Sequence, residues 1–312
     1  MPCFLSIARA ISAGRQLPER GEMYLDHVGW MVPDMDAAAR AFTRLGFALT
    51  PYSPHSNQDP ETGRIVPQGS ANRLAMLERG YLEILTPVAG ADTGMARHLK
   101  DSIGRYVGVH LIAFAVADAP AEAERLAGAG FRLQPTVDLR RTIEAADGSE
   151  VQVAFTVVRP RFGSIPEGRL QVLAHLTPEH LWQARYIARD NAVTGLCEVV
   201  LAVPDPEASA GRLTRFTGRE VRETDGGATI LLDRGRLTFS TPEAIARRYG
   251  GLSLPPAPAM AAVGLVSRDL DRTRGFLLGR DLRLLVDEPE RLIVDPQDAM
   301  GAALVIEPEQ NG

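Results

Sequence analysis

The stretch His27-Val-Gly-Trp-Met-Val-Pro-Asp34 decides the fold. Its apolar residues alternate as in a strand until Pro33-Asp34, and residues 35–45 then carry apolar side chains at helical spacing before Gly46-Phe47. Asp34 suits the N-cap of that helix, because its carboxylate can accept a hydrogen bond from a first-turn amide. The order of signals therefore predicts a strand, a capped helix and a stop.

The same order of signals recurs three times along the chain, with Asp118, Asp205 and Asp269 in the place of Asp34. Each copy also closes with a strand that follows a glycine, at residues 80–85, 168–173, 235–240 and 301–306. Alternating runs between helix and closing strand, such as residues 73–77, 151–158 and 229–233, predict two middle strands. The chain is therefore expected to be an α+β protein of four βαβββ modules.

The length of 312 residues favours two domains. We expect residues 23–185 to hold modules one and two with the candidate active site, and residues 186–312 to hold a second, shortened pair with a structural role. Residues 1–22 form an N-terminal extension that we expect to be flexible. Residues 86–105, 177–191 and 252–258 are predicted to be linkers.

Composition narrows the class of partner. The net charge of -5 argues against a nucleic-acid footprint, and no apolar run approaches the roughly 20 residues that span a bilayer. The two cysteines, Cys3 and Cys197, provide no disulfide framework, which is typical of a cytoplasmic protein. Lys100, the only lysine, lies in no nucleotide motif, and neither a nucleotide nor a flavin cofactor is expected. A small molecule is the expected ligand, and a homodimer stays open.

Several stretches resemble the glyoxalase-like branch of the vicinal-oxygen-chelate superfamily, which includes glyoxalase I, extradiol dioxygenases and bleomycin-resistance proteins. They are Leu25-Asp-His-Val28, Gly69-Ser-Ala-Asn-Arg73, Gly80-Tyr-Leu-Glu83 and Thr177-Pro-Glu-His-Leu-Trp182. The resemblance covers nearly the whole chain after Met23. It implies that two modules curl into an open, sheet-lined cup, where first-strand and fourth-strand side chains hold a divalent metal. The resemblance does not identify the reaction, because proteins that share this fold carry out many different reactions.

Strand alternation indicates which side chains reach the first cup, since residues two apart share a face. His27 and Met31 are expected to face the cup, whereas Trp30 lies on the helix-packed side of the same strand. Glu83 is flanked by apolar residues and is expected to point toward His27. Imidazole and carboxylate together form a suitable half-site for Fe, Mn, Zn, Ni or Co. Glu83 is in addition the candidate catalytic proton carrier.

The second module offers weaker metal ligands. Gln171 takes the position of Glu83, while Leu111 matches His27 and His110 lies one residue out of register. A one-residue bulge would bring His110 to the metal and complete a triad of two histidines and one carboxylate. The matching positions of the later modules provide no convincing second site: Glu198, Thr238, Ala262 and Leu304.

The long insertion at residues 50–73 is the candidate substrate loop. His55, Asn72 and Arg73 are its candidate binding residues. Arg73 can form a bidentate contact with a carboxylate or phosphate, and Asn72 can hydrogen-bond a carbonyl or hydroxyl group. The alternative is a solvated hairpin. Apolar wall candidates are Trp30, Met31, Phe114 and Tyr81. His175 and His180 are expected to have surface or inter-domain roles.

Two readings of function stay open. In the first, a metal-dependent lyase, isomerase or dioxygenase chelates two adjacent oxygens of a small organic substrate. In the second, a metal-free protein sequesters an apolar small molecule in the cup, as bleomycin-resistance proteins do. Modules three and four could in either case be a packing or dimerisation platform.

Overall fold

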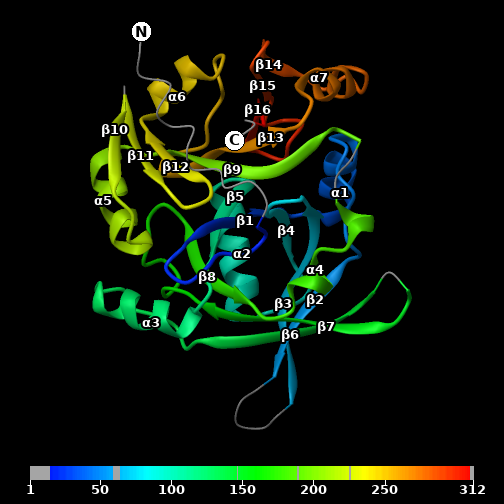
Figure 1. Cartoon of the computed structure of the whole chain (residues 1–312), viewed down its shortest axis with the longest axis vertical. Helices are drawn as coiled ribbons and strands as arrows, with labels where there is room; N and C mark the ends of the chain where they lie inside the picture. Colours follow the sequence, from blue (N-terminus) through cyan, green and yellow to red (C-terminus); the bar gives the residue numbers. More distant parts are fainter. Residues whose placement is uncertain (1–14, 59–63, 146, 188–189, 225, 310–312) are drawn as a thin grey trace.

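The structure is a computed structural model that describes residues 15–58, 64–145, 147–187, 190–224 and 226–309 (Figure 1). The first module consists of β1 (Tyr24–Met31), α1 (Met35–Arg44), β2 (Ser53–Gln58), β3 (Ile65–Met76) and β4 (Tyr81–Pro87). The second consists of β5 (Gly108–Ala115), α3 (Ala119–Gly128), β6 (Val137–Glu144), β7 (Glu150–Val158) and β8 (Arg169–His175).

The C-terminal half repeats this order. The third module consists of β9 (Val193–Ala202), α5 (Pro206–Thr217), β10 (Val221–Thr224), β11 (Gly227–Leu231) and β12 (Arg236–Ser240). The fourth consists of β13 (Ala259–Ser267), α7 (Leu270–Leu278), β14 (Leu284–Glu288), β15 (Arg291–Val294) and β16 (Ala303–Pro308). The predicted α+β fold of four βαβββ modules is therefore confirmed.

Each module helix begins at the predicted aspartate cap. Asp34 accepts hydrogen bonds from the amides of Asp36 and Ala37. The carboxylates of the other three caps, Asp118, Asp205 and Asp269, each accept one from the third residue beyond the cap. These bonds satisfy amides that have no partner within the helix. The local signal in the sequence thus set all four helix starts.

The first and last strands of every module pair in parallel, as β1–β4, β5–β8, β9–β12 and β13–β16. Antiparallel pairing of β1 with β5, and of β9 with β13, joins two modules into one curved sheet in each half. The halves meet where Met260 of β13 pairs with Val109 of β5. In Figure 1 the N-terminal half fills the lower part of the view and the C-terminal half the upper part. We call their concave faces the first and second cup.

The predicted linkers contain helices that the sequence analysis missed. The linker at residues 86–105 ends in α2 (Gly94–Arg105), whose Leu99 packs on Met31 and Leu111 in the first cup. In the second cup α6 (Pro242–Arg248) takes the same place, with Ile245 packed on Val200. The linker at 177–191 contains α4 (Pro178–Leu181) and the short 3-10 helix η1 (Ala184–Tyr186). Each helix fills sheet surface that would otherwise stay open.

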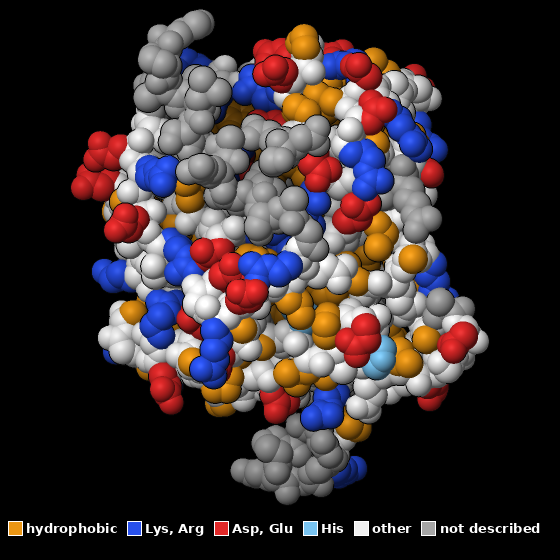
Figure 2. All heavy atoms as spheres, viewed as in Figure 1, with side chains coloured by type: hydrophobic (Ala, Val, Ile, Leu, Met, Phe, Trp, Pro, Cys, Tyr) orange, Lys and Arg blue, Asp and Glu red, His pale blue; other side chains and the backbone are white. Residues whose placement is uncertain are grey.

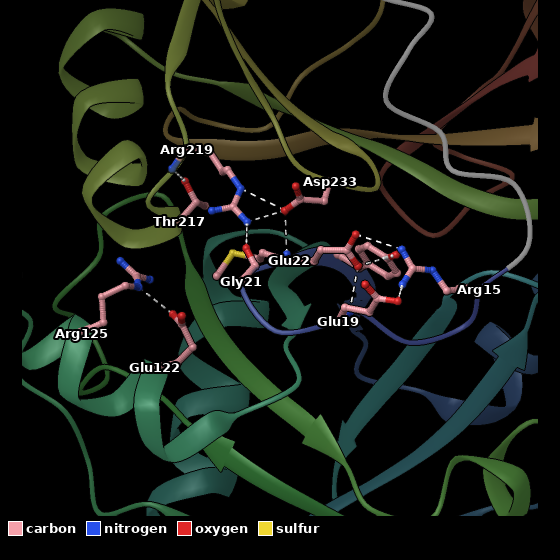
Figure 3. Close-up of polar contacts among 11 residues, drawn as sticks. Arg15, Glu19, Gly21, Glu22, Glu122, Arg125, Thr217, Arg219 and Asp233 are labelled. Carbon is pink, nitrogen blue, oxygen red and sulfur yellow. Dashed lines mark hydrogen bonds and ion pairs between the residues drawn. The ribbon is translucent and has the colours of Figure 1, made fainter. Parts of the chain in front are cut away.

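Polar contacts tie the N-terminal segment and the second module to the third module (Figure 3). Arg219 donates to the carbonyl of Gly21 and to Asp233, whose carboxylate also accepts from the amide of Met23. Arg125 of α3 donates to the carbonyl of Phe216 at the end of α5. Residues 15–22 of the expected flexible extension are thus hydrogen-bonded, while residues 1–14, with Cys3, lie outside the described residues.

The surface shows no concentration of one charge on the face drawn in Figure 2, where basic and acidic side chains are interspersed. Within the described ranges, no helix is both long and apolar enough to cross a membrane.

Removing a cap should cost stability without changing the fold. We expect Asp205→Ala to lower the free energy of unfolding by about 1 kcal/mol, because the amide of Ala208 loses its 2.9 Å partner. Urea denaturation measures the change. Glu223→Ala on β10 removes the same charge outside any helix and serves as the control. An equal loss in both variants would contradict the capping role.

Candidate functional site

A cavity of about 380 Å³ lies over the first cup, and we call it the first-cup cavity. Its walls come from both N-terminal modules and from the linker that follows β8. The polar and ionisable part of the lining includes His27, Asn72, Tyr81, Glu83, Arg141, Glu144, Gln171 and Gln183. Apolar walls are provided by Leu74, Leu139, Ile143, Val153, Phe155, Val157, Leu173 and Leu181. A cavity of this size suits a small organic molecule.

Three predicted metal ligands meet in this cavity. The Nε2 atom of His27 lies 3.7 Å from Oε2 of Glu83 and 3.3 Å from the side-chain amide of Gln171. All three side chains are buried. Asn72 donates to Oε1 of Glu83 at 2.7 Å and so fixes the carboxylate. The parallel pairing of β1 with β4 and of β5 with β8 places these residues on one face, as strand alternation predicted.

Asp26 is fully buried and bridges two histidines. Its Oδ2 lies 2.7 Å from Nδ1 of His27, and its Oδ1 lies 2.8 Å from Nε2 of His175. A carboxylate accepts hydrogen bonds, so His27 carries its proton on Nδ1 and presents the Nε2 lone pair to Glu83 and Gln171. A carboxylate behind a histidine in this way orients metal-binding imidazoles.

A β-bulge explains how neighbouring residues of β1 reach the same side. Leu25 pairs with Phe114 and His27 pairs with Ala113, so Asp26 is an extra residue in β1. Tyr81 then stacks on the imidazole of His27 at 4.3 Å between ring centroids. The ring is therefore held by a hydrogen bond at one edge and by packing on one face.

The Glu83 carboxyl is ionised at neutral pH. Burial alone would raise its pKa, but the electrostatic effect of the neighbouring His27 and His55 imidazoles and the hydrogen bond from Asn72 outweigh burial and lower the pKa. The same balance acts at Asp26, where His175 and His27 overcome burial and hold the pKa well below its usual range. The cavity thus contains an anionic carboxylate oxygen of Glu83 beside the imidazole Nε2 of His27.

His110 does not join His27. The pairing of β1 and β5 does shift at this point, since Gly29 pairs with Leu111 and Trp30 with Val109. The His110 ring nevertheless turns away from the cavity, where its Nε2 donates to the carbonyl of Tyr106 at 2.8 Å. The two-histidine triad considered from the sequence is therefore not assembled.

Leu111 fills the position where a ligand from the second module would lie. A Cβ atom on Gly29 would approach the Leu111 side chain to 2.9 Å, so the two strands are closely packed here. Among the described residues, no three His, Cys, Asp or Glu side chains gather as a metal site. His27, Glu83 and the neutral amide of Gln171 are the donors available. Ligand atoms about 2.1 Å from a metal lie about 3 to 3.5 Å apart. The 3.7 Å between Nε2 of His27 and Oε2 of Glu83 is slightly wider than that, and the Gln171 atom nearest to Nε2 is its amide nitrogen, while its Oε1 accepts from Arg169, so an ion would require the Gln171 amide to turn.

Other predicted binding residues lie away from the cavity. Trp30 is fully buried on the helix side, where its indole donates to the carbonyl of Ala299 at 3.0 Å. Met31 faces the cup but is covered by Leu99 of α2. Arg73 lies on the opposite face of β3 from Asn72 and donates to the carbonyl of Thr50. Phe114, a wall candidate, packs against Phe216 in the core.

The insertion at residues 50–73 forms most of the β2–β3 hairpin, and residues 59–63 lie outside the described part. Only its base reaches the cavity, through residues 50–53 and Asn72. His55 lies next to this base, with Nδ1 3.0 Å from Oγ of Ser70. The charges of Glu83 and Arg141 both act on its imidazole, Glu83 raising its pKa and Arg141 lowering it.

Sequence reasoning missed five residues that contribute to the site. Arg141 lines the cavity from β6, where the inward positions are otherwise apolar: Val137, Leu139 and Ile143. That break in alternation was the available signal. His175 was expected near the surface, yet its side chain is 1% exposed. It lies on the same face of β8 as Gln171, which is four residues earlier in the chain. The linker residues Leu181, Gln183 and Tyr186 also close the cavity.

The second cup differs from the first in the residues at the positions that match His27 and Glu83. Glu198 takes the position of His27, but it pairs with Arg236 at 2.7 Å and accepts a hydrogen bond from Thr238. In module four, Ala262 is paired with Ala303, so Val305 rather than Leu304 occupies the cup-facing position matched to Glu83. The closing strand of that module was assigned one residue out of register.

Comparison with known proteins agrees with this architecture. Residues 25–217 match the family model described as the glyoxalase-like domain. No curated protein matches the chain. A crystal structure of a hypothetical protein from Staphylococcus aureus is similar over 92% of this chain and 100% of its own, with a TM-score of 0.63 and 11% identity.

Two further solved structures share the fold. A mutant of 4-hydroxymandelate synthase from Streptomyces coelicolor is similar over 93% of this chain and 94% of its own, with a TM-score of 0.53 and 13% identity. A xylose isomerase-like TIM barrel/4-hydroxyphenylpyruvate dioxygenase fusion protein is similar over 97% of this chain and 52% of its own, again with a TM-score of 0.53 and 13% identity.

His55 should make stability depend on pH. Burial, followed by the charge of Arg141, lowers the pKa of His55 to about 3. Because this value lies below the unfolded value of about 6.5, the stabilisation is present above that pH and is lost as the pH falls. Between about pH 7 and about pH 5, the parent should lose at least about 1 kcal/mol more unfolding free energy than His55→Gln.

Urea denaturation at a series of pH values measures this difference. His180→Gln, which removes a partly exposed histidine of the linker outside the first-cup cavity, is the control substitution. The same slope in the parent and in His55→Gln would show that His55 does not titrate as described.

Proposed function

Because the chain belongs to the glyoxalase-like domain family of the vicinal-oxygen-chelate superfamily, we propose that its first cup is a metal-dependent active site for a small oxygen-bearing substrate. His27, Glu83 and Gln171 would hold the ion. The observation that carries this proposal is the buried Asp26 on Nδ1 of His27, which leaves Nε2 as a fixed lone pair beside the Glu83 carboxylate. A histidine oriented by a carboxylate is the usual preparation for binding a metal.

A bound divalent metal would supply Lewis acidity, polarising two adjacent oxygens of the substrate. The chain's own residues then determine which substrates fit. Arg141 provides a cationic donor beside Glu83, which suits a substrate that carries a carboxylate or an enolate-like oxygen. Leu139, Phe155 and Val157 offer apolar contact to the rest of the molecule. Lyase, isomerase and dioxygenase chemistries remain the candidate reactions.

Glu83 is the candidate proton carrier, because its lowered pKa keeps it ionised and able to accept a proton. Asn72 holds one carboxylate oxygen and leaves the other facing His27. A carboxylate with one oxygen fixed is suited to move a proton at the other without changing its position.

A metal-free binding protein is the second candidate function. Leu111 favours it, because an apolar side chain stands where the second module would offer a ligand. In this reading the polar cluster would orient a ligand by hydrogen bonds, and the apolar walls would provide most of the affinity.

Metal content separates the two candidates. We expect protein purified without chelator to contain about one equivalent of a transition metal, and His27→Ala combined with Glu83→Ala to contain almost none. Elemental analysis of the full chain makes the measurement. His180→Ala combined with Glu179→Ala removes an exposed His–Glu pair from the linker and should keep the metal.

Absence of metal from the parent, also after incubation with Fe, Mn, Zn, Ni and Co salts, would exclude the metal-dependent proposal. Equal metal content in the parent and in the His27 and Glu83 double variant would show that the metal binds elsewhere in the protein.

Asp26 should act as a positioning residue. Asp26→Asn keeps the shape but removes the charge that fixes the tautomer of His27, so we expect metal affinity to fall by about 10-fold to 100-fold. Competition with a chelator measures the affinity, and the free energy of unfolding of the metal-free protein shows any structural loss separately. Unchanged affinity in a folded variant would exclude this role.

A further inference from the structure

A second cavity, of about 470 Å³, lies on the other side of Arg169 from the metal ligands, and we call it the α2 cavity. Its lining comes from α2, from the segment at residues 160–168 and from the start of β8. Arg169 lies at its inner end, where Nη2 is 3.3 Å from Oε1 of Gln171. The α2 cavity therefore adjoins the first-cup cavity but has its own walls.

Positive charge dominates the α2 cavity. Four arginines line it, Arg97, Arg105, Arg161 and Arg169, whereas Asp101 is the one acidic residue in the described lining. His98 and His110 also line it, and burial lowers the pKa of each to about 4, so both are neutral at pH 7. The excess charge therefore comes from guanidinium groups, which stay protonated.

Existing contacts leave much of this charge uncompensated. Arg97 pairs with Asp92 on the surface, and Arg105 donates to the carbonyl of Pro258. Arg161 and Arg169 have no carboxylate partner among the described residues. The Nε atom of Arg169 is buried, and within the described part of the chain it has no hydrogen-bond acceptor. A buried donor without an acceptor is unusual in a folded protein.

The aromatic ring of Phe162 lies beside the arginine side chains of the α2 cavity. The Phe162 ring stacks on His98 with 4.3 Å between ring centroids, and the guanidinium carbon of Arg169 lies 5.4 Å from the centre of the Phe162 ring. Phe162 is 39% exposed, which is high for a large apolar side chain. The α2 cavity thus offers donors for an anion and a partly exposed aromatic ring for an apolar group.

We propose that the α2 cavity binds a phosphorylated small molecule, with its phosphate among the arginines and its apolar part against Phe162. Arginines reach the cavity from a helix, from a loop and from a strand, so they approach an anion from several directions. A tetrahedral phosphate can accept from several such donors, whereas a planar carboxylate matches one or two forks. Because Asp92 pairs with Arg97, the other three arginines less Asp101 leave an excess of two positive charges, which also favours an anion with more than one charge.

This site does not depend on the proposed metal chemistry, and it can be tested without knowing the natural ligand. The probe is pyrophosphate, titrated into the full chain by calorimetry in about 0.15 M sodium chloride, where weak surface attraction is screened. We expect one site with a dissociation constant below about 1 mM. Arg161→Gln and Arg169→Gln should each weaken binding by about tenfold or more, because each removes a charge-assisted hydrogen bond.

Arg222→Gln removes an exposed arginine from β10 and is the matched control, which should bind pyrophosphate as the parent does. Arg161 lies on the surface of its loop, so its variant keeps the test valid if Arg169→Gln fails to fold. Absence of binding up to about 10 mM pyrophosphate would overturn the proposal. So would equal weakening in Arg222→Gln and Arg161→Gln. Citrate that binds as tightly as pyrophosphate would overturn the assignment to phosphate.

Discussion

Parallel pairing between the first and last strands of each module is the constraint on which the rest of this structure depends. In module one it aligns β1 with β4, and in module two β5 with β8. Because side chains alternate along a strand, these registers place Glu83 on the same face as His27, and the antiparallel pairing of β1 with β5 then brings Gln171 to the same cup. The same pairing in the second half brings Glu198 beside Arg236, where a buried ion pair replaces a ligand set. One backbone arrangement therefore produces a polar cavity in one half and a buried glutamate paired with an arginine at the matching position of the other.

The electrostatic design of the first cup centres on a residue with no direct exposure to it. Asp26 is completely buried, and a carboxylate in that position is tolerated only because two imidazoles donate to it. In return it fixes the ring of His27, and Tyr81 limits the rotation of that ring from one face. Glu83 is fixed separately by Asn72. His27 and Glu83, the two strongest candidate metal ligands, are thus held by independent partners from different strands. This is the arrangement expected of a preorganised site.

Local signals in the sequence were sufficient for the repeat, the four aspartate caps and the meeting of His27, Glu83 and Gln171. They were insufficient wherever a strand departs from regular pairing. The bulge sought at His110 does occur, but the ring turns toward Tyr106, and a second bulge at Asp26 creates the histidine bridge. A bulge depends on which strand lies alongside, and one strand's sequence does not carry that information. The sequence analysis missed the helix α2 for a related reason, because its helical state is stabilised by an apolar contact across the first cup.

The order of the modules along the chain has a consequence for how the protein is made. Every parallel ladder joins strands about 50 residues apart, so no module is complete until its last strand has been synthesised. The first cup can close once β8 has left the ribosome, and the linker after β8 then covers its mouth. The third module can then contact the N-terminal half through Arg219 and Phe216, whereas pairing of β13 with β5 must wait until about 80 residues after β8. Vectorial synthesis therefore gives the N-terminal half time to fold before β13 can reach the edge of β5.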